Sequence, residues 1–244
     1  MISNLSLIPA AAFAVAVSLT SIPGAAMADD APSFTPDKAH TAVLITDPQN
    51  DFMSTEGKAW GLVGDNVTRL GTNDHIEALI RAAKQSGMTV VVSPHTYYGT
   101  DDQWQDRGPV QGLLHSVGAF KVAGATAYDG FEGSGADFYG PLKEMILDGQ
   151  TVITSPHKVY GPESNDLALQ LRQRGIQTVI LGGFAANLCV DSHMRELTEQ
   201  GFSVVVVKDA VGAPGEAAYD AAMLNAGMIA DAVWSTEEAL AFIE

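Results

Sequence analysis

The stretch that decides the fold is GGFAANLCVDSHMREL, from Gly182 to Leu197. An apolar, β-branched run precedes it and predicts a buried strand, whereas the residues after it are typical of a helix. Cys189, the only cysteine among 244 residues, therefore falls where a strand passes into a helix. Two interpretations suit a thiol at such a position: a small buried hydrophobic residue or a nucleophile.

Apolar runs of the same kind recur along the chain with helical patterns between them. Four of the predicted helices end in glycine, which commonly stops a helix. Strand, helix, glycine and strand in repetition predict a parallel sheet covered on both faces. We therefore expect a three-layer α/β/α doubly wound fold with a six-stranded, mostly parallel sheet. The predicted strands are 41–47, 89–94, 150–156, 177–183, 202–210 and 228–234, of which 150–156 and 228–234 carry the weaker pattern.

The formal net charge of −16 limits the partners of the chain. A protein this acidic is a poor match for nucleic acid or for an anionic lipid surface, because both repel it. A single cysteine cannot form an internal disulfide, so the thiol is expected to be free.

The N-terminal segment has the features of an export signal. Residues 7–19 form an apolar core too short to span a bilayer, and Ala26–Ala28 supplies a small-x-small cleavage pattern, although no Lys or Arg precedes the core. We expect a signal peptide over 1–28, a linker over 29–40 and one domain over 41–244. The mature protein would be exported, periplasmic or secreted, without membrane attachment.

A long insertion over 96–141 interrupts the alternation of strands and helices. It is rich in Gly, Asp and aromatic residues. Segments of this length between strands usually act as lids over a site or as contacts between subunits. Either role is open from the sequence.

Chemically useful side chains follow four of the predicted strands. Because ligands of open parallel sheets gather at the carboxyl ends of the strands, we expect these side chains to meet at one edge. A thiol that meets a carboxylate base, a cation and the backbone N–H groups of a helix start has what acyl transfer needs. The residues are Asp47, His95, the pair His157 and Lys158, and Cys189.

These motifs resemble those of the isochorismatase-like cysteine hydrolases, the superfamily of nicotinamidase, N-carbamoylsarcosine amidase and other small-amide hydrolases. The resemblance covers about 41–234. It depends on DPQNDF after the first strand, a Lys after the third, GFAANLCV around the thiol, and EQGFSVVVVKDA after the next helix.

The resemblance implies a catalytic triad of Asp47, Lys158 and Cys189. Asp47 would take the thiol proton, Lys158 would hold Asp47, and Cys189 would form a thioester with the substrate. The resemblance also implies a cis peptide bond between Phe184 and Ala185, and an oxyanion hole made by the N–H groups of Ala185 and Cys189.

The sequence departs from the family at the pocket. Nicotinamidases carry an Asp-x-His metal pair after the second strand, where this chain reads SPHTYYG, so we expect no metal and no cofactor. The Ser-Ala-Phe group that often follows the Lys is also missing. The expected substrate-binding residues are Phe52, His95, Tyr160 and His193.

Three classes of function remain open. The first is a hydrolase that cleaves a C–N bond of a small carboxamide through Cys189, in a protein that is a homo-oligomer like many relatives. The second is a vinyl-ether hydrolase of the isochorismatase type, which does not need the thiol. The third is a non-catalytic ligand-binding or redox protein on the same fold. A redox role would need a second cysteine to resolve the oxidised thiol, and the chain has only one.

Overall fold

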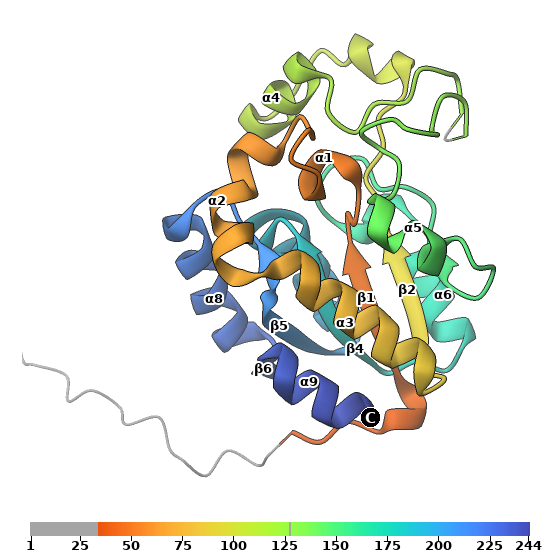
Figure 1. Cartoon of the computed structure of the whole chain (residues 1–244), viewed down its shortest axis with the longest axis vertical. Helices are drawn as coiled ribbons and strands as arrows, with labels where there is room; N and C mark the ends of the chain where they lie inside the picture. Colours follow the sequence, from red (N-terminus) through yellow and green to blue (C-terminus); the bar gives the residue numbers. More distant parts are fainter. Residues whose placement is uncertain (1–33, 127) are drawn as a thin grey trace, which may run out of the picture. The chain divides into compact units, whose positions relative to one another are not determined.

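The computed structural model describes residues 34–126 and 128–244. The predicted signal peptide lies outside the described residues. Six parallel strands form one sheet in the order β3-β2-β1-β4-β5-β6 (Figure 1). The expected α/β fold is confirmed. The strands are β1 (Thr41–Thr46), β2 (Thr89–Ser93), β3 (Val152–Ile153), β4 (Thr178–Phe184), β5 (Ser203–Gly212) and β6 (Ala232–Trp234).

The central strand β1 is buried on both faces, which explains its uninterrupted apolar sequence. Because successive side chains of a strand point to opposite faces, Val43 and Ile45 belong to one core cluster and Ala42 and Leu44 to the other. The sheet therefore separates two apolar cores within a single domain.

Helices cover both faces of the sheet, as the repeating pattern predicts. The core cluster of Val43 includes side chains of α2 (Trp60–Leu70), α3 (Thr72–Gln85) and α9 (Thr236–Ile243). The cluster of Leu44 includes side chains of α6 (Leu167–Gln173), α7 (Asp191–Glu199) and α8 (Glu216–Ile229). The result is the expected three-layer α/β/α arrangement.

The position of the site follows from the strand order. β1 pairs with β2 on one side and with β4 on the other, so the order reverses between β1 and β4. Ligands of such sheets bind at the carboxyl ends of the strands next to this reversal. Asp47 directly follows β1, and Cys189 lies five residues beyond β4.

The two strands with the weaker pattern are the shortest and lie at the two edges of the sheet. β3 has two residues and β6 three, fewer than the sequence predicts. An edge strand has only one neighbour, so fewer hydrogen bonds hold the ends of each strand extended.

The insertion over 96–141 contains short helices and irregular chain, drawn in yellow-green to green in Figure 1. An isolated bridge between Tyr97 and Lys121 closes its first part into a loop, and Phe120 at its base has a φ of 55°. The remaining helical elements of the domain are η1 (Lys38–His40), α1 (Asn50–Met53), η2 (Gly99–Gln103), α4 (Pro109–Val117), α5 (Gly140–Ile146), η3 (Pro162–Ser164) and the π-type turn η4 (Ala186–Val190).

Residues 34–40, the described part of the predicted linker, contact the domain. Phe34 packs against the core, and the carboxylate of Asp37 accepts a hydrogen bond from the backbone N–H of Ala39 at the start of η1. Among the described residues, none of the helices has the length and apolar character to cross a bilayer.

Candidate active site

Asp47 is a fully buried acid at the end of β1. Its backbone has a φ of 50°, a left-handed conformation that is uncommon for a residue with a side chain. The carboxylate atom Oδ1 accepts a hydrogen bond of 2.8 Å from Nε2 of His157, whose ring is also fully buried. The second oxygen, Oδ2, has no hydrogen-bond partner among the described residues.

Cys189 lies in the π-type turn η4, between β4 and α7. The peptide bond between Phe184 and Ala185 is cis, as the resemblance implies. Gly183 has a φ of 116°, and a Cβ atom there would collide with the backbone oxygen of Thr46. Only glycine allows β4 to approach β1 this closely just before the turn. The turn that holds the thiol is thus fixed directly beside the end of β1.

The environment of the sulfur favours the protonated thiol. Burial raises the pKa of Cys189 well above its ordinary value, and the negative charge of Asp47 raises this pKa further. The backbone N–H groups of Ala185 and of Cys189 itself act in the opposite direction. These two N–H groups therefore face the sulfur, where the oxyanion hole is expected.

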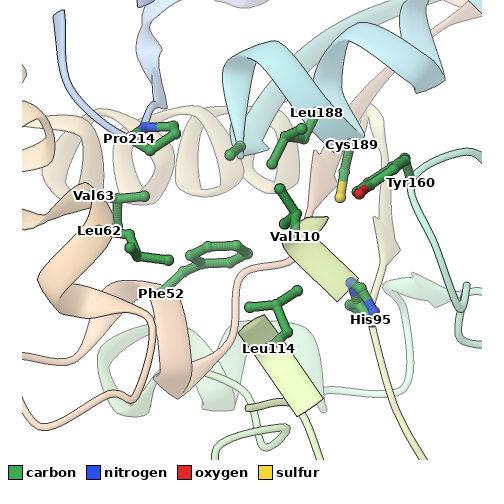
Figure 2. Close-up of a pocket in the computed structure, with 11 residues that line it drawn as sticks. Phe52, Leu62, Val63, His95, Val110, Leu114, Tyr160, Leu188, Cys189 and Pro214 are labelled. Carbon is green, nitrogen blue, oxygen red and sulfur yellow. The ribbon is translucent and has the colours of Figure 1, made fainter. Parts of the chain in front are cut away.

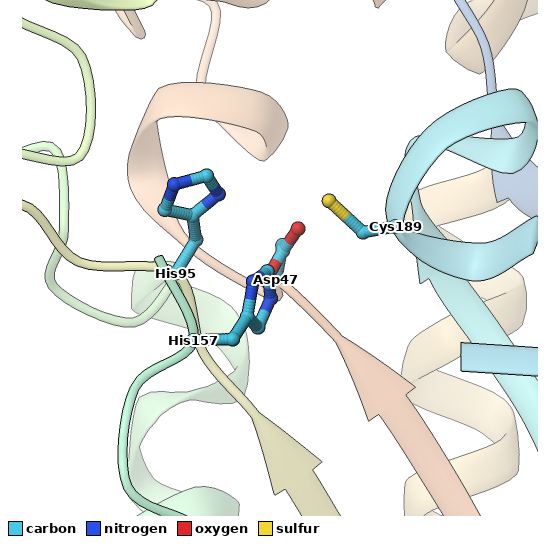
Figure 3. Close-up of side chains that lie close together, drawn as sticks. All are labelled: Asp47, His95, His157 and Cys189. Atoms are coloured by element: carbon cyan, nitrogen blue, oxygen red, sulfur yellow. The ribbon is translucent and has the colours of Figure 1, made fainter. Parts of the chain in front are cut away.

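Four buried side chains meet at this point: Asp47, His95, His157 and Cys189. One donor atom from each lies within 4.8 Å of the others. Figure 3 shows the carboxylate of Asp47 pointing towards the sulfur, with the ring of His95 on the other side of the gap. An acid and a thiol thus meet as the sequence predicts, and two imidazoles accompany them.

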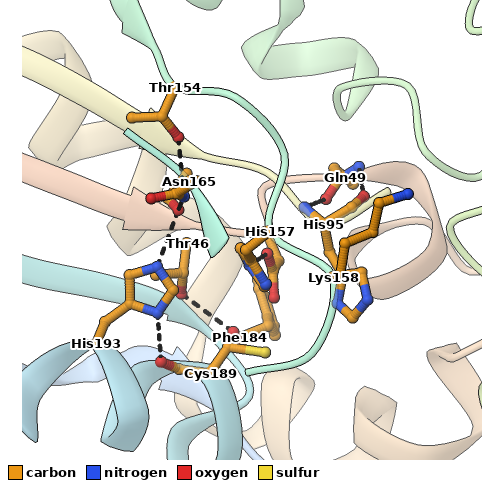
Figure 4. A network of polar contacts seen from close by, with 12 residues as sticks. Thr46, Gln49, His95, Thr154, His157, Lys158, Asn165, Phe184, Cys189 and His193 are labelled. Atoms are coloured by element: carbon orange, nitrogen blue, oxygen red, sulfur yellow. Dashed lines mark hydrogen bonds and ion pairs between the residues drawn. The ribbon is translucent and has the colours of Figure 1, made fainter. Parts of the chain in front are cut away.

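Lys158 does not hold Asp47, so the expected pairing is wrong. Its Nζ atom lies 2.5 Å from Oδ2 of Asp101 and 3.3 Å from the centre of the Tyr98 ring. Successive side chains of an extended chain point to opposite sides, so the inward position of His157 turns Lys158 outward. Figure 4 shows the ammonium directed away from Cys189. His157 takes the place beside Asp47 that the resemblance assigns to Lys158.

His95 is held in place through its backbone by Gln49. Oε1 of Gln49 accepts from the N–H of His95 at 2.8 Å, and Nε2 donates to the carbonyl oxygen of His95 at 2.7 Å. The ring stacks on Phe120, with centroids 5.1 Å apart. Burial lowers the pKa of His95 well below its ordinary value, so the ring is neutral at pH 7. Gln49 belongs to the DPQNDF motif, and the structure gives it this supporting role.

A cavity of about 30 Å³ lies beside the thiol (Figure 2). Three of the four predicted substrate-binding residues, Phe52, His95 and Tyr160, line it. Most of its wall is apolar. The other lining residues are Leu62, Val63, Val110, Leu114, Ala185, Leu188, Cys189 and Pro214.

The insertion contributes part of this wall. Val110 and Leu114 come from α4, and their side chains lie four residues apart on one face of the helix. Figure 2 shows both in the neighbourhood of Phe52 and His95. The insertion therefore forms one side of the site. The residues of α4 carry an apolar pattern, but their place in the fold was not predicted.

The fourth predicted substrate-binding residue, His193, does not line the cavity, and this prediction is wrong. Its ring is fully buried behind the nucleophile (Figure 4), with Nδ1 2.7 Å from the carbonyl oxygen of Cys189 and Nε2 2.9 Å from Oγ of Ser93. His193 lies one helical turn after Cys189, so its side chain reaches back to that carbonyl instead of the pocket. Asn165 in turn donates to Oγ of Ser93, which ties the network to the segment after β3.

His193 is expected to make the fold sensitive to acid. Burial lowers its pKa to about 3, whereas in the unfolded chain it takes a proton near its ordinary pKa of 6.5. Below pH 6.5 the unfolded state binds more protons, so stability is complete above that pH and falls as the pH decreases. From pH 7.5 to 5 we expect a loss of about 2 kcal/mol in the free energy of unfolding from this group alone. Urea unfolding at pH 7.5 and at pH 5 measures this difference in the free energy of unfolding.

The variant His193→Gln removes this titration while keeping a polar side chain. Its stability should change less between pH 7.5 and 5 than that of the wild type, by about 2 kcal/mol. His40→Gln, at an exposed histidine beside Asp37, is the control and should retain the wild-type pH dependence. Equal pH dependence in wild type and His193→Gln would contradict the prediction.

The fold and the site define a class of protein. A thiol at the strand reversal of a doubly wound sheet, beside a buried carboxylate and two backbone N–H groups, is the arrangement that a hydrolase with a cysteine nucleophile requires. Comparison with known families agrees, because residues 41–238 match the Isochorismatase domain. The chain belongs to the Isochorismatase family and is a hydrolase.

The individual proteins to which the chain is similar share a low percentage of identical residues with it. The chain is 28% identical over 185 residues to the ureidoacrylate amidohydrolase RutB of Variovorax paradoxus, covering 75% of this chain and 72% of the relative. The crystal structure of a cysteine hydrolase from Pseudomonas syringae pv. phaseolicola superposes with a TM-score of 0.67 at 20% identity, covering 86% of this chain and 95% of that one. The crystal structure of N-carbamoylsarcosine amidase from Thermoplasma acidophilum superposes with a TM-score of 0.58 at 18% identity, covering 81% of this chain and 96% of that one.

Proposed function

We propose that the protein hydrolyses the C–N bond of a small, uncharged carboxamide through a thioester on Cys189. The observation that carries this proposal is the unpartnered Oδ2 of Asp47 beside a buried thiol that opens onto a small, mostly apolar cavity. A base, a nucleophile and room for one small acyl group are thus found together. A charged acyl group would lose its hydration in this cavity, because no Asp, Glu, Lys or Arg is among the residues that line it.

Asp47 serves as the general base in the first half of the reaction. Because the thiol has a raised pKa, it is protonated in the resting enzyme and has to lose its proton as it attacks. Oδ2 of Asp47 takes that proton, while the hydrogen bond from His157 to Oδ1 fixes the orientation of the carboxylate. His157 thereby supplies the support that the resemblance assigns to Lys158.

The developing charge on the substrate oxygen is stabilised by the turn. The N–H groups of Ala185 and Cys189 face the sulfur and suit the position of the tetrahedral oxyanion. One such donor contributes about 3 kcal/mol to the transition state. Asp47 then passes its proton to the leaving amine, and a water molecule, deprotonated by the same carboxylate, cleaves the thioester.

The relatives support a C–N substrate. The printed names of RutB and of N-carbamoylsarcosine amidase describe an amidohydrolase and an amidase, and both act on C–N bonds according to those names. A vinyl-ether hydrolase would need the acid but not the thiol, and the position of Cys189 beside Asp47 favours the covalent reaction.

Trapping the thioester tests the proposal. A panel of small amides is assayed for ammonia release, and the enzyme is quenched with acid during turnover of the best substrate and weighed by intact mass spectrometry. We expect an added mass equal to the acyl group. Because Cys189 is the only cysteine, a thioester can form only there.

As the control, enzyme whose thiol is first blocked with iodoacetamide should release no ammonia and gain no acyl mass. Ammonia release at an unchanged rate after complete blocking would overturn the covalent mechanism.

A further inference from the structure

The reactive cluster holds more donor atoms than the proposed hydrolysis uses. Nε2 of His95 is buried and, like Oδ2 of Asp47, has no hydrogen-bond partner among the described residues. Buried polar atoms are nearly always paired, so two orphaned atoms in one cluster require an explanation. The proposed mechanism accounts for Oδ2 but not for the nitrogen of His95.

These residues form a mixed donor set of one sulfur, two imidazole nitrogens and one carboxylate oxygen. Zinc is bound in proteins by four ligands of these types in a tetrahedral arrangement. Thiolate and imidazole together favour zinc over magnesium or calcium, which prefer oxygen ligands. The chemistry of the set therefore selects a borderline-soft divalent cation.

The geometry is close to what such an ion needs. Bonds of 2.0 to 2.3 Å in a tetrahedron place the ligand atoms about 3.3 to 3.8 Å apart. The four donor atoms lie within 4.8 Å of one another, so the two atoms that are farthest apart have to move closer together by about 1 Å to bind one ion. His95 and Cys189 both border the cavity, which gives an ion a way in from that side.

From this arrangement we propose that Asp47, His95, His157 and Cys189 form a zinc-type binding site whose occupation reversibly inhibits the hydrolase. On binding, the thiol proton is released to the buffer, and the sulfur gains a bond to the ion. The hydrogen on Nε2 of His157 moves to the unpartnered Nδ1, so that the ring stays neutral and Nε2 becomes free to bind. The nucleophile and its base are then both ligands of the metal, and neither is available to a substrate.

Binding is measured on the metal-stripped protein without any substrate. Zn²⁺ is titrated with detection by native mass spectrometry, and Co²⁺ is used as a spectroscopic probe because its bond to a thiolate gives a charge-transfer absorption. We expect one ion per chain and a sulfur-to-cobalt band. Where a substrate is found, Zn²⁺ should also abolish turnover, and a chelator should restore it.

Variants assign the ligands. His95→Gln and Cys189→Ser each remove one donor and should weaken Zn²⁺ binding by at least about 100-fold, because even changes behind a ligand cost 10- to 100-fold. His115→Gln is the matched control: His115 packs against Tyr97 and is not one of the four donors, so this variant should leave the affinity unchanged. Circular dichroism of each variant confirms that it is folded.

Two results would overturn the inference: no stoichiometric binding to the wild type, or binding that both ligand variants retain at full affinity. Since neither readout needs an amide substrate, these results are separate from a failure of the proposed hydrolysis.

Discussion

Replacement of Cys189 by alanine is expected to lower amide turnover by about 10⁴-fold or more. The reaction loses its nucleophile, and what remains is the contribution of the cavity and of the two N–H groups. The side chain is small and buried, with 3% of its surface exposed, so the variant should fold. The comparison requires kcat and KM for the best amide of the panel, with the loss expected in kcat.

The same variant separates the covalent reaction from its main alternative. A vinyl-ether hydrolase would keep its activity without the thiol, because a protonated acid suffices for that chemistry. Cys189→Ser supplies a second comparison, since a hydroxyl is a far weaker nucleophile beside the same base. Turnover of the alanine variant within tenfold of the wild-type value would exclude the thioester.

Replacement of Asp47 by asparagine should change two properties of the thiol in opposite directions. Hydrolysis should slow by about 10³- to 10⁴-fold, because an amide oxygen cannot take the thiol proton in the transition state. Alkylation by iodoacetamide near pH 8 should instead become faster. The carboxylate is one of the causes that raise the pKa of Cys189, and removing its charge increases the fraction of thiolate.

Alkylation is followed by intact mass spectrometry, and hydrolysis by ammonia release. Asp191→Asn is the matched control: it makes the same change in charge two residues after the thiol, at a carboxylate 2.7 Å from Arg195. This control should leave both rates near their wild-type values. If Asp47→Asn slows alkylation together with hydrolysis, the carboxylate is not what raises the thiol pKa, and the proposed role of Asp47 is wrong.

The sequence predicts most of the fold because the interior strands are buried on both faces. A run such as TAVLIT has no charged residue, and its only polar side chains are the β-branched threonines at its two ends, so the strand and its depth follow from composition. The same reasoning places Asp47 and Cys189 together, since both follow strands that pair in parallel register. It also predicts the edge strands, though not their shortness.

The sequence does not determine which of two adjacent residues, His157 or Lys158, lies beside Asp47. His157 and Lys158 follow an edge strand of two residues, where too little regular structure exists to fix which side chain points inward. A shift of one residue in an extended chain exchanges the two sides. The resemblance favours the lysine, and the structure places the histidine beside Asp47.

The pocket wall from α4 could not be predicted because no pattern in the insertion ties it to a strand end. Val110 and Leu114 reach the site through the fold of the 96–141 segment as a whole, which involves contacts between distant residues such as Tyr97 and Lys121. Export, cleavage of the signal peptide and assembly into a homo-oligomer stay predictions.

The close approach of Gly183 to Thr46 has a consequence for how this enzyme can change. The thiol and the carboxylate follow two paired strands in the middle of the sheet, whereas part of the cavity wall belongs to α4 in the 96–141 insertion. Exchange of that insertion can therefore alter which compounds are accepted while the spacing of sulfur and carboxylate stays the same. The residues expected to react and the helix expected to select the substrate therefore belong to different segments of the chain.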